Sequence, residues 1–356
     1  MTAPVADKER LRWGLTLVRM GPALMLLLLA IAMSILTPVF LSGRNLGNIG
    51  LESSVVALLA LGQLLVIITA GIDLSVGSVI AFASVLGALW VREANIVEGW
   101  LIIPSMIAGG ILAGAVSGTL FVKGRLPHPF LATLAMMMVA RGAALLISEG
   151  RPITGMPPAI LALGSHRVFG VPIAVFLVLG LALLVHILLS RITWGQWIYA
   201  VGANKEGAKR VGIPVDRVLI SVYVISGFFA GVAALVVSGQ TNSAYPTAGN
   251  LLELSAIAAV IIGGASFFGG RGTVFGALVG ALILGVIQNG LNLLNVAAAW
   301  QYVALGVVVI IAVEMDVVRQ RLETRLKTAE AEHKPVDQKE VDQKEVDQKE
   351  VDQKAK

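Results

Sequence analysis

Ten apolar runs follow one another along the chain, each bounded by charged residues or by clusters of glycine and proline. They cover residues 20–40, 51–70, 74–91, 100–122, 129–147, 171–189, 218–238, 251–268, 273–294 and 300–313. A helix that crosses a bilayer needs about 20 predominantly apolar residues. The pattern therefore predicts an all-α polytopic membrane protein with about ten transmembrane helices. Only Gly71, Ile72 and Asp73 separate the second run from the third, so these two runs also fit one interrupted hairpin.

The amino-acid composition agrees with this pattern. Of the 356 residues, 56% are hydrophobic and 14% are charged, whereas a typical soluble domain is about 45–50% apolar and about 25% charged. A water-soluble chain of this size needs more polar surface than these residues provide. The composition excludes a soluble enzyme and a receptor with a single membrane anchor.

Few residues are suited to catalysis, and none of the patterns fits a metal site. The chain has no cysteine and only four histidines, which excludes disulfides, thiolate metal sites and thiol nucleophiles. Ser117, Ser226 and Ser238 each precede a glycine, but none lies in a Gly-x-Ser-Gly element. We therefore expect no catalytic residue, no bound metal and no enzymatic activity.

The spacing Gly-x4-Gly occurs at Gly202 and again at Gly264. Neither copy continues with the lysine and the serine or threonine that hold phosphates and Mg²⁺ in a phosphate-binding loop. We expect this chain to bind no nucleotide, so that any ATP and Mg²⁺ are held by another subunit.

Lysine and arginine fall unevenly between the two sets of connecting segments. With a cytoplasmic N-terminus, the inside segments before the last helix hold Lys8, Arg10, Arg12, Arg19, Lys123, Arg125, Arg191, Lys205, Lys209, Arg210, Arg217 and Arg271, and the outside segments hold Arg44, Arg92, Arg151 and Arg167. Cytoplasmic loops are enriched in Lys and Arg, so we expect both termini in the cytoplasm. The N-terminal residues show no pattern of a removed signal peptide.

These patterns divide the chain into three parts. Residues 1–19 are predicted to form a cytoplasmic N-terminal segment, residues 20–318 the transmembrane domain with a long inside loop at 190–217, and residues 319–356 a cytoplasmic tail. The last 21 residues repeat the pentapeptide Val-Asp-Gln-Lys-Glu. A period of five matches neither helix nor strand, so we expect a disordered tail, with a docking role as the alternative.

The inside loop contains one short helix with both ends specified. Asn204 can cap its first turn, Glu206 lies where the helix dipole favours an anion, and Arg210 lies in the last turn where it favours a cation. Gly212 can adopt the left-handed conformation that ends a helix, and Pro214 prevents continuation. Without an apolar stripe, this helix is marginal alone in water. It is either a solvated connector or a segment shaped to bind in a groove on another protein.

Most glycines in the runs have small-residue spacing that favours close helix packing, as in Gly110, Gly114 and Gly118. The stretch around Asp73, Ser75 and Gly77 is different, because glycines interrupt an apolar run and an acid follows. Asp73 can cap the next helix while its charge stays at the inner interface, or it can contact the solute directly.

Few ionisable groups lie deep in the runs. Arg141 is about twelve residues into its run, at a depth from which it can pair with Glu52 or Glu253 near the outer ends of theirs. The ninth run carries the neutral amides Gln288, Asn289 and Asn292 in its outer half. Neutral amides suit hydroxylated solutes because they replace water without imposing a charge. Hydrogen bonding between helices is the competing interpretation.

Four segments give the chain a family resemblance. They are Ile67-Ile68-Thr69-Ala70-Gly71-Ile72-Asp73-Leu74-Ser75-Val76-Gly77-Ser78; Pro129-Phe130-Leu131-Ala132-Thr133 with Arg141-Gly142; Ala200-Val201-Gly202-Ala203-Asn204; and Glu253-Leu254-Ser255-Ala256 with Gly269-Gly270-Arg271-Gly272 and Asn289-Gly290-Leu291-Asn292. The sequence resembles the inner-membrane permease subunits of bacterial ABC importers of the ribose/xylose/arabinose type. The likeness runs in order along almost the whole chain except the tail.

This resemblance implies a transport subunit of the bacterial inner membrane. Its expected partners are a cytoplasmic ABC ATPase, an extracytoplasmic sugar-binding protein, a second permease copy and the lipid bilayer, with no nucleic acid. The inside loop would couple to the ATPase through Ala200, Gly202, Asn204, Lys205, Glu206, Ala208 and Gly212. Structural or gating roles would fall to Asp73, Ser75, Gly77, Arg141, Glu253 and Arg271. Gln288, Asn289, Asn292 and Ser117 would lie along the substrate pathway.

Three positions depart from the family pattern. Ser255 stands where relatives usually have aspartate, Ser117 where asparagine is common, and His128 where a proline precedes Pro129. The expected function is ATP-driven, binding-protein-dependent import of a monosaccharide or a related polyol. The alternative is a stand-alone secondary carrier or channel for a small polar solute, which the scarcity of deep carboxylates for proton or sodium coupling disfavours.

Overall fold

The computed structural model describes residues 5–94 and 98–331, and most of them are helical. The helices are α1 (Val5–Leu36), α2 (Gly43–Ile68), α3 (Val76–Ala94), α4 (Gly99–Lys123), α5 (Pro129–Ser148), α6 (Pro158–Ser165), α7 (Ile173–Arg191), α8 (Thr193–Ala203), α9 (Lys205–Arg210), α10 (Val215–Thr241), α11 (Leu252–Ile262), α12 (Val274–Leu293) and α13 (Ala298–Ala331). Four two-residue strands accompany them: β1 (Ile153–Thr154), β2 (Arg167–Val168), β3 (Val171–Pro172) and β4 (Ser243–Ala244).

The chain is divided into two compact units. Residues Met20–Asp316 form one unit, and Met1–Arg19 with Val317–Lys356 form the other. The predicted pentapeptide tail at residues 336–356 lies outside the described residues. All packing below concerns the unit Met20–Asp316.

The expected all-α membrane fold is confirmed. Among the described residues, eight helices are long and apolar enough to cross a bilayer: α2, α3, α4, α5, α7, α10, α12 and residues 299–318 of α13. Two shorter apolar helices, Met20–Leu36 within α1 and α11, account for the other two predicted runs. The first run ends at Leu36 rather than at Phe40, because Pro38 disfavours helical backbone at Thr37.

The predicted span at residues 251–268 needs correction. The helix there, α11, has 11 residues and is about 16 Å long, roughly half of the about 30 Å hydrocarbon core. The chain forms turns up to Leu251, which has a left-handed backbone with φ of 64°. At the other end, Gly264 with φ of 90° stops the helix. Apolar composition continued beyond both ends of the helix, so hydropathy alone overestimated its length.

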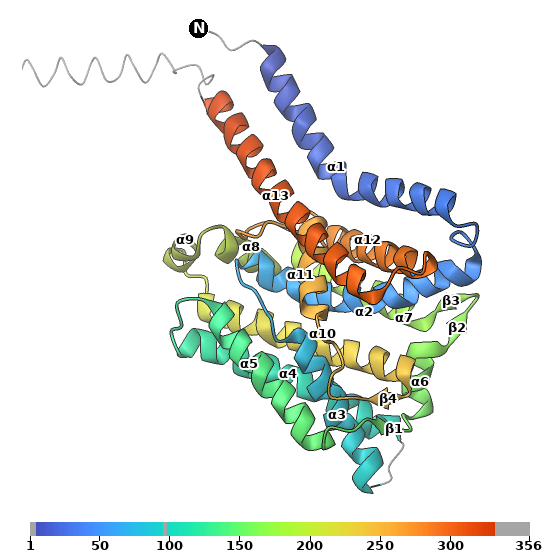
Figure 1. Ribbon diagram of the computed structural model, residues 1–356. Coiled ribbons are helices and arrows are strands. Elements are labelled where there is room, and N and C mark those ends of the chain that lie inside the picture. Colours follow the sequence, from blue (N-terminus) through green and yellow to red (C-terminus); the bar gives the residue numbers. More distant parts are fainter. Residues whose placement is uncertain (1–4, 95–97, 332–356) are drawn as a thin grey trace, which may run out of the picture. The chain divides into compact units, whose positions relative to one another are not determined.

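Helix α2 lies in the centre of this unit. Every residue from Ser53 to Ile68 is buried, and the helix packs against α10, α12 and α11. Its neighbour α10 also packs closely on α4 (Figure 1). A Cβ at Gly110 would overlap the backbone of Gly227 on α10, which confirms that the small-residue stripe on α4 allows the two backbones to approach.

The bundle has two distinct ends (Figure 1). The strands lie at one end, where β1 pairs antiparallel with β4 through Ile153 and Ala244, and β2 and β3 form a hairpin. Helices α8 and α9 lie at the opposite end. We call these the strand end and the α9 end.

Candidate functional site

The short helix expected in the inside loop is confirmed as α9. The Asn204 Oδ1 atom accepts a hydrogen bond from the Gly207 N–H at 2.8 Å, which caps the first turn. Glu206 lies in that first turn and Arg210 in the last. Gly212 has the left-handed backbone expected after a helix end, with φ of 84°. The Gly212 N–H donates to the Lys209 carbonyl in the last turn. Local capping therefore specifies this helix as the sequence indicated.

Helix α8, which precedes α9, was not predicted as a separate element. Its residue Gly202 packs directly against the end of α2, because a Cβ there would overlap the Ile68 carbonyl oxygen. The same oxygen accepts a hydrogen bond from the Gly270 N–H at 2.8 Å. Three segments distant in sequence therefore meet at the last turn of α2. Gly202, predicted as a coupling residue, therefore contacts the bundle, and Ala200, another of them, is half-buried on α8.

Two side chains fix α8 and α9 on the bundle. The Tyr199 hydroxyl donates to the Gly272 carbonyl at 2.8 Å, and burial raises the pKa of this phenol above its ordinary value. The hydroxyl therefore stays protonated at neutral pH and remains a donor. On α9, the Lys205 ammonium lies 5.7 Å from the centre of the Phe121 ring, a cation–π distance.

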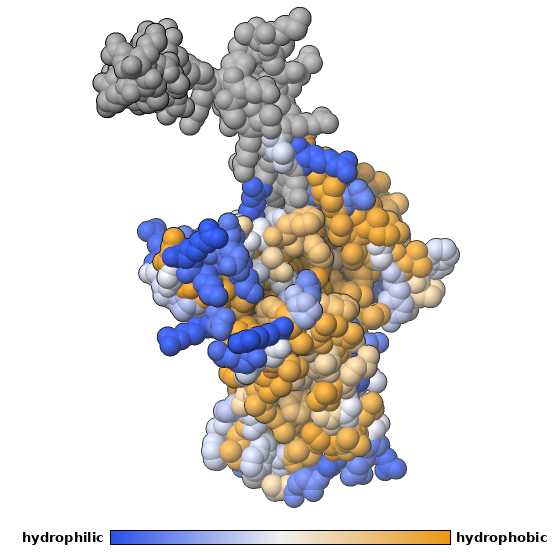
Figure 2. All heavy atoms as spheres, turned by 90° about the vertical axis from the view of Figure 1, so that its left-hand side faces the viewer, coloured by the Kyte–Doolittle hydropathy of each residue, from blue (hydrophilic) through white to orange (hydrophobic). Residues whose placement is uncertain are grey.

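The rest of α9 is free of the bundle. Ala208 is buried, whereas Glu206, Lys209 and Arg210 are exposed and the side chain of Val211 is 77% exposed. Figure 2 views this end, where hydrophilic residues gather in a patch beside hydrophobic surface. We call Glu206, Lys209, Arg210 and Val211 the α9 surface. An exposed apolar side chain among charges is what a docking surface for another protein offers.

Residues 69–75, which connect α2 with α3, run back into the bundle. The Gln63 side-chain amide on α2 donates to the Asp73 carbonyl, and the Thr133 hydroxyl on α5 donates to the Ile72 carbonyl at 3.3 Å. Side chains from two helices thus bind carbonyls that no helix satisfies, as non-helical backbone at membrane depth requires. Helices α2 and α3 are two separate candidate spans joined by this connection, as the ten-run interpretation predicted.

Asp73 is buried inside this connection, with 1% of its surface exposed. Its carboxylate accepts hydrogen bonds from the Ser75 N–H at 3.0 Å, the Ser75 hydroxyl at 2.6 Å and the Ser226 hydroxyl on α10 at 2.8 Å. Ser75 is the residue directly before α3. Its carbonyl accepts the first hydrogen bond of that helix, from the Val79 N–H. The expectation that Asp73 keeps its charge at an interface is thus corrected. It orients Ser75 and links the connection to α10.

The first turns of α3 and α11 meet inside the bundle. A Cβ at Gly77 on α3 would overlap both the Gly249 carbonyl oxygen and the Oε2 atom of Glu253 on α11. Two helix N-termini therefore lie side by side inside the bundle, an arrangement found in transporters with discontinuous helices.

Arg141 on α5 binds the turns that lead to α11. Its Nη1 atom donates to the Pro246 carbonyl at 2.7 Å and to the Ala248 carbonyl at 3.0 Å. Among the described residues, no ion pair within 4 Å joins Arg141 to Glu52 or Glu253, so the predicted direct pair is corrected. The guanidinium and the Glu253 carboxylate still attract each other over a longer distance. Arg271 lies in the loop after α11, with its carbonyl accepting from the Ser266 N–H.

The four residues predicted for the substrate pathway lie in different environments. Asn289 exchanges two hydrogen bonds of 3.0 Å with Asn45 on α2, which joins two helices. Ser117 is fully buried and donates to the Ala113 carbonyl of its own helix at 3.0 Å. Asn292 accepts from Gln301 at 2.7 Å. Gln288 lines a pocket on the described part of the chain.

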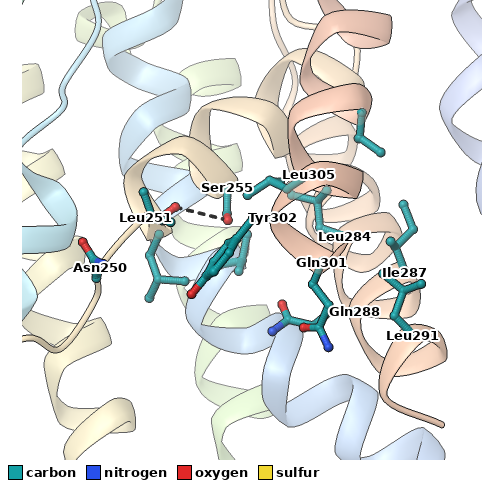
Figure 3. Close-up of a pocket in the computed structure, with 13 residues that line it drawn as sticks. Asn250, Leu251, Ser255, Leu284, Ile287, Gln288, Leu291, Gln301, Tyr302 and Leu305 are labelled. Carbon is teal, nitrogen blue, oxygen red and sulfur yellow. Dashed lines mark hydrogen bonds between the residues drawn. The ribbon is translucent and has the colours of Figure 1, made fainter. Parts of the chain in front are cut away.

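This pocket has a volume of about 190 Å³ and lies between α2, α11, α12 and α13. Its lining is Val56, Asn250, Leu251, Leu252, Ser255, Leu284, Ile287, Gln288, Leu291, Gln301, Tyr302, Leu305 and Val308. Figure 3 shows Gln288 and Gln301 side by side, with the Tyr302 ring between them and Ser255. Gln301 and Tyr302 were not predicted as site residues, because only the fold brings α13 to the pocket beside α11.

The chain is similar in sequence to a known family of transport proteins. Residues 45–313 match the family described as branched-chain amino acid transport system / permease component. The chain is 39% identical to the ribose import permease protein of Bacillus subtilis, over 87% of this chain and 96% of that protein. It is 36% identical to the D-allose transport system permease protein of Escherichia coli, with 87% and 95% covered. The fructose import permease protein of Rhizobium meliloti is also 36% identical, with 83% and 84% covered. No solved structure matches the chain.

Proposed function

This chain belongs to the family of ABC-importer permease components, and from that premise we propose that it carries a monosaccharide or a related polyol across the membrane. It is a multi-pass protein of the bacterial inner membrane and a transport subunit rather than an enzyme. Three relatives, each of which matches this chain over most of its length, are named for ribose, allose and fructose. Their shared chemistry, a small neutral polyol, is the substrate class we assign to this chain.

We propose further that the α9 surface contacts a cytoplasmic ATPase that binds the ATP and Mg²⁺. The observation that carries this assignment is the position of α9. One face is held on the bundle through Lys205, Ala208 and the adjoining Gly202, while Glu206 and Val211 stay exposed. A helix so placed receives force from a partner and passes it to the end of α2. Under this proposal the α9 end lies in the cytoplasm, which the distribution of Lys and Arg supports.

The strand end then faces outward and receives the sugar-binding protein that delivers the solute. A second copy of this chain completes the pathway, since two ATPase subunits act on two permease subunits in our proposal. Alternating access would follow from rigid-body motion of the ATPase pair, transmitted through α8 and α9.

The α9 assignment is tested by reversing one exposed charge. In the reconstituted complex with the ATPase and the binding protein, Glu206→Arg should lower binding-protein-stimulated ATP hydrolysis at least fivefold. The matched control is Asp216→Arg, an exposed charge reversal in the first turn of α10, at the same end but outside the α9 surface, which should leave hydrolysis within twofold of the wild type. Equal hydrolysis by all three proteins would refute the assignment. Uptake by the chain alone, driven by an ion gradient, would instead favour a secondary carrier.

A further inference from the structure

The pocket between α2, α11, α12 and α13 has a size and position suited to a small solute. Its volume of about 190 Å³ corresponds to about six water molecules at about 30 Å³ each. It borders Leu251 and Leu252, where the turns end and α11 begins. At that junction the first turns of α3 and α11 meet, and transporters with discontinuous helices form their substrate sites at such helix ends.

Polar groups in the pocket are neutral. The lining includes the amides of Asn250, Gln288 and Gln301 and the hydroxyls of Ser255 and Tyr302, but no lysine, arginine, aspartate or glutamate. The family description names branched-chain amino acids, whose ammonium and carboxylate groups need charged or strongly polar partners when removed from water. This lining provides no charge to pair with either group. It favours an uncharged solute.

Two of these polar side chains have hydrogen-bonding capacity to spare. Gln288 is exposed within a membrane-spanning helix, and no hydrogen bond among the described residues uses its amide. A neutral amide left unpaired toward lipid costs free energy, whereas one directed into a hydrated pocket binds water or solute hydroxyls (Figure 3). The side-chain N–H groups of Gln301 donate hydrogen bonds to the Asn292 side chain and the Val296 carbonyl. The side-chain carbonyl oxygen of Gln301 can therefore accept a hydrogen bond from a solute hydroxyl.

The pocket also has an apolar side. Tyr302 presents an aromatic ring beside the amides (Figure 3), and Leu284, Leu291 and Leu305 complete the lining. Aromatic side chains combine an apolar ring with a polar tip. A ring-shaped polyol has the matching distribution, with hydroxyls at its edge and C–H groups on its face.

We propose that this pocket binds the transported solute during its passage, and that the solute is an uncharged polyol contacted by Gln288, Gln301 and Tyr302. The proposal rests on the proposed function, because it assigns a contact site to the same transport. It also identifies Gln301 and Tyr302 on α13 as determinants of specificity.

The first test compares transport by matched variants in proteoliposomes that contain the ATPase and the binding protein, with radiolabelled D-ribose as the probe. Gln288→Leu and Tyr302→Leu should each lower the number of ribose molecules moved per ATP hydrolysed at least fivefold, and Tyr302→Phe should lower it less. The control is Thr119→Val, which removes an exposed hydroxyl on α4 outside the pocket and should stay within twofold of the wild type. Ratios for the pocket variants equal to that of the control would overturn the proposal.

A second test does not depend on how well these variants fold. Since the chain has no native cysteine, Ser255→Cys introduces a single thiol in the pocket. A small charged methanethiosulfonate reagent should modify it, and D-ribose with binding protein and MgATP should slow the modification at least threefold, whereas L-leucine should not. A thiol that the reagent cannot reach, or equal protection by leucine, would overturn the proposal. If the wild type shows no ATP-dependent uptake of any sugar tested while the thiol is still protected, the proposed function fails and the binding site stands.

Discussion

Replacing Arg141 by methionine tests how the turns before α11 are held inside the membrane. The substitution keeps a long flexible side chain but removes the donor of two hydrogen bonds, at 2.7 Å to the Pro246 carbonyl and at 3.0 Å to the Ala248 carbonyl. Hydrogen bonds from charged groups contribute about 1.5–3 kcal/mol each. Because Arg141 is only half-buried, we use the lower value, which gives about 3 kcal/mol for the pair.

The assay is thermal unfolding of the purified protein in detergent. At roughly 2 °C for each kcal/mol, Arg141→Met should lower the melting temperature by about 6 °C. Arg151→Met, which removes an exposed arginine just after α5, is the matched control and should change it by less than about 1 °C. Arg141→Lys keeps the charge and one donor, so it should fall between the two.

A second substitution separates the hydrogen bonds from the charge. Without Arg141, the buried carboxylate of Glu253 loses the cation that attracts it. Glu253→Gln should therefore destabilise the wild type but partly restore the melting temperature of Arg141→Met, since groups that interact are not additive. Strict additivity of the two changes, or an Arg141→Met protein that melts like Arg151→Met, would refute this account of the site.

Three further predictions concern close contacts and caps. Gly202→Ala should force α8 away from α2 at a cost of about 1–3 kcal/mol and lower stimulated ATP hydrolysis at least fivefold, whereas Gly142→Ala, which has open space around it, should leave hydrolysis unchanged. Asn204→Ala removes the α9 cap, so hydrogen exchange of the first-turn amides should accelerate about fivefold for a loss of about 1 kcal/mol. Asn289→Leu leaves the buried amide of Asn45 without its partner and should cost about 1–3 kcal/mol in unfolding experiments; adding Asn45→Leu should cost less than the sum of both.

The sequence predicted the parts of this structure that local chemistry determines. Helix α9 required only its own capping residues, and both Asn204 and Gly212 have the predicted roles. Long apolar helices followed from composition because the bilayer requires them. Helix α11 was overestimated because a buried turn surrounded by other helices is as apolar as a helix, and hydropathy does not distinguish the two.

Contacts between segments that are distant along the chain were not predictable from the sequence. Asp73 was expected near an interface, but the fold buries it against Ser226, 153 positions later in the chain. Arg141 was expected to pair with a carboxylate, yet it binds backbone carbonyls that only the turns before α11 expose. Among the amides of α12, Asn289 hydrogen-bonds to another helix, as one of the two interpretations expected. Gln288 lines the pocket, and its contact with a solute stays a prediction. A lone amide in an apolar run, such as Gln63, was the one visible signal that went unused.

The segment from Ile68 to Gly77 connects the two halves of the proposed mechanism. At one end, the Ile68 carbonyl contacts Gly202 of α8, next to the α9 surface. At the other end, Gly77 contacts Gly249 and Glu253 at the start of α11, where the pocket begins. The contacts of Gly202 with Ile68 and of Gly77 with Gly249 are between backbones, and close-packed interiors transmit strain. A shift of α8 relative to α2 therefore reaches the pocket through residues 69–75, of which all but Ala70 are buried or half-buried, with Asp73 and Ser226 fixing the path against α10.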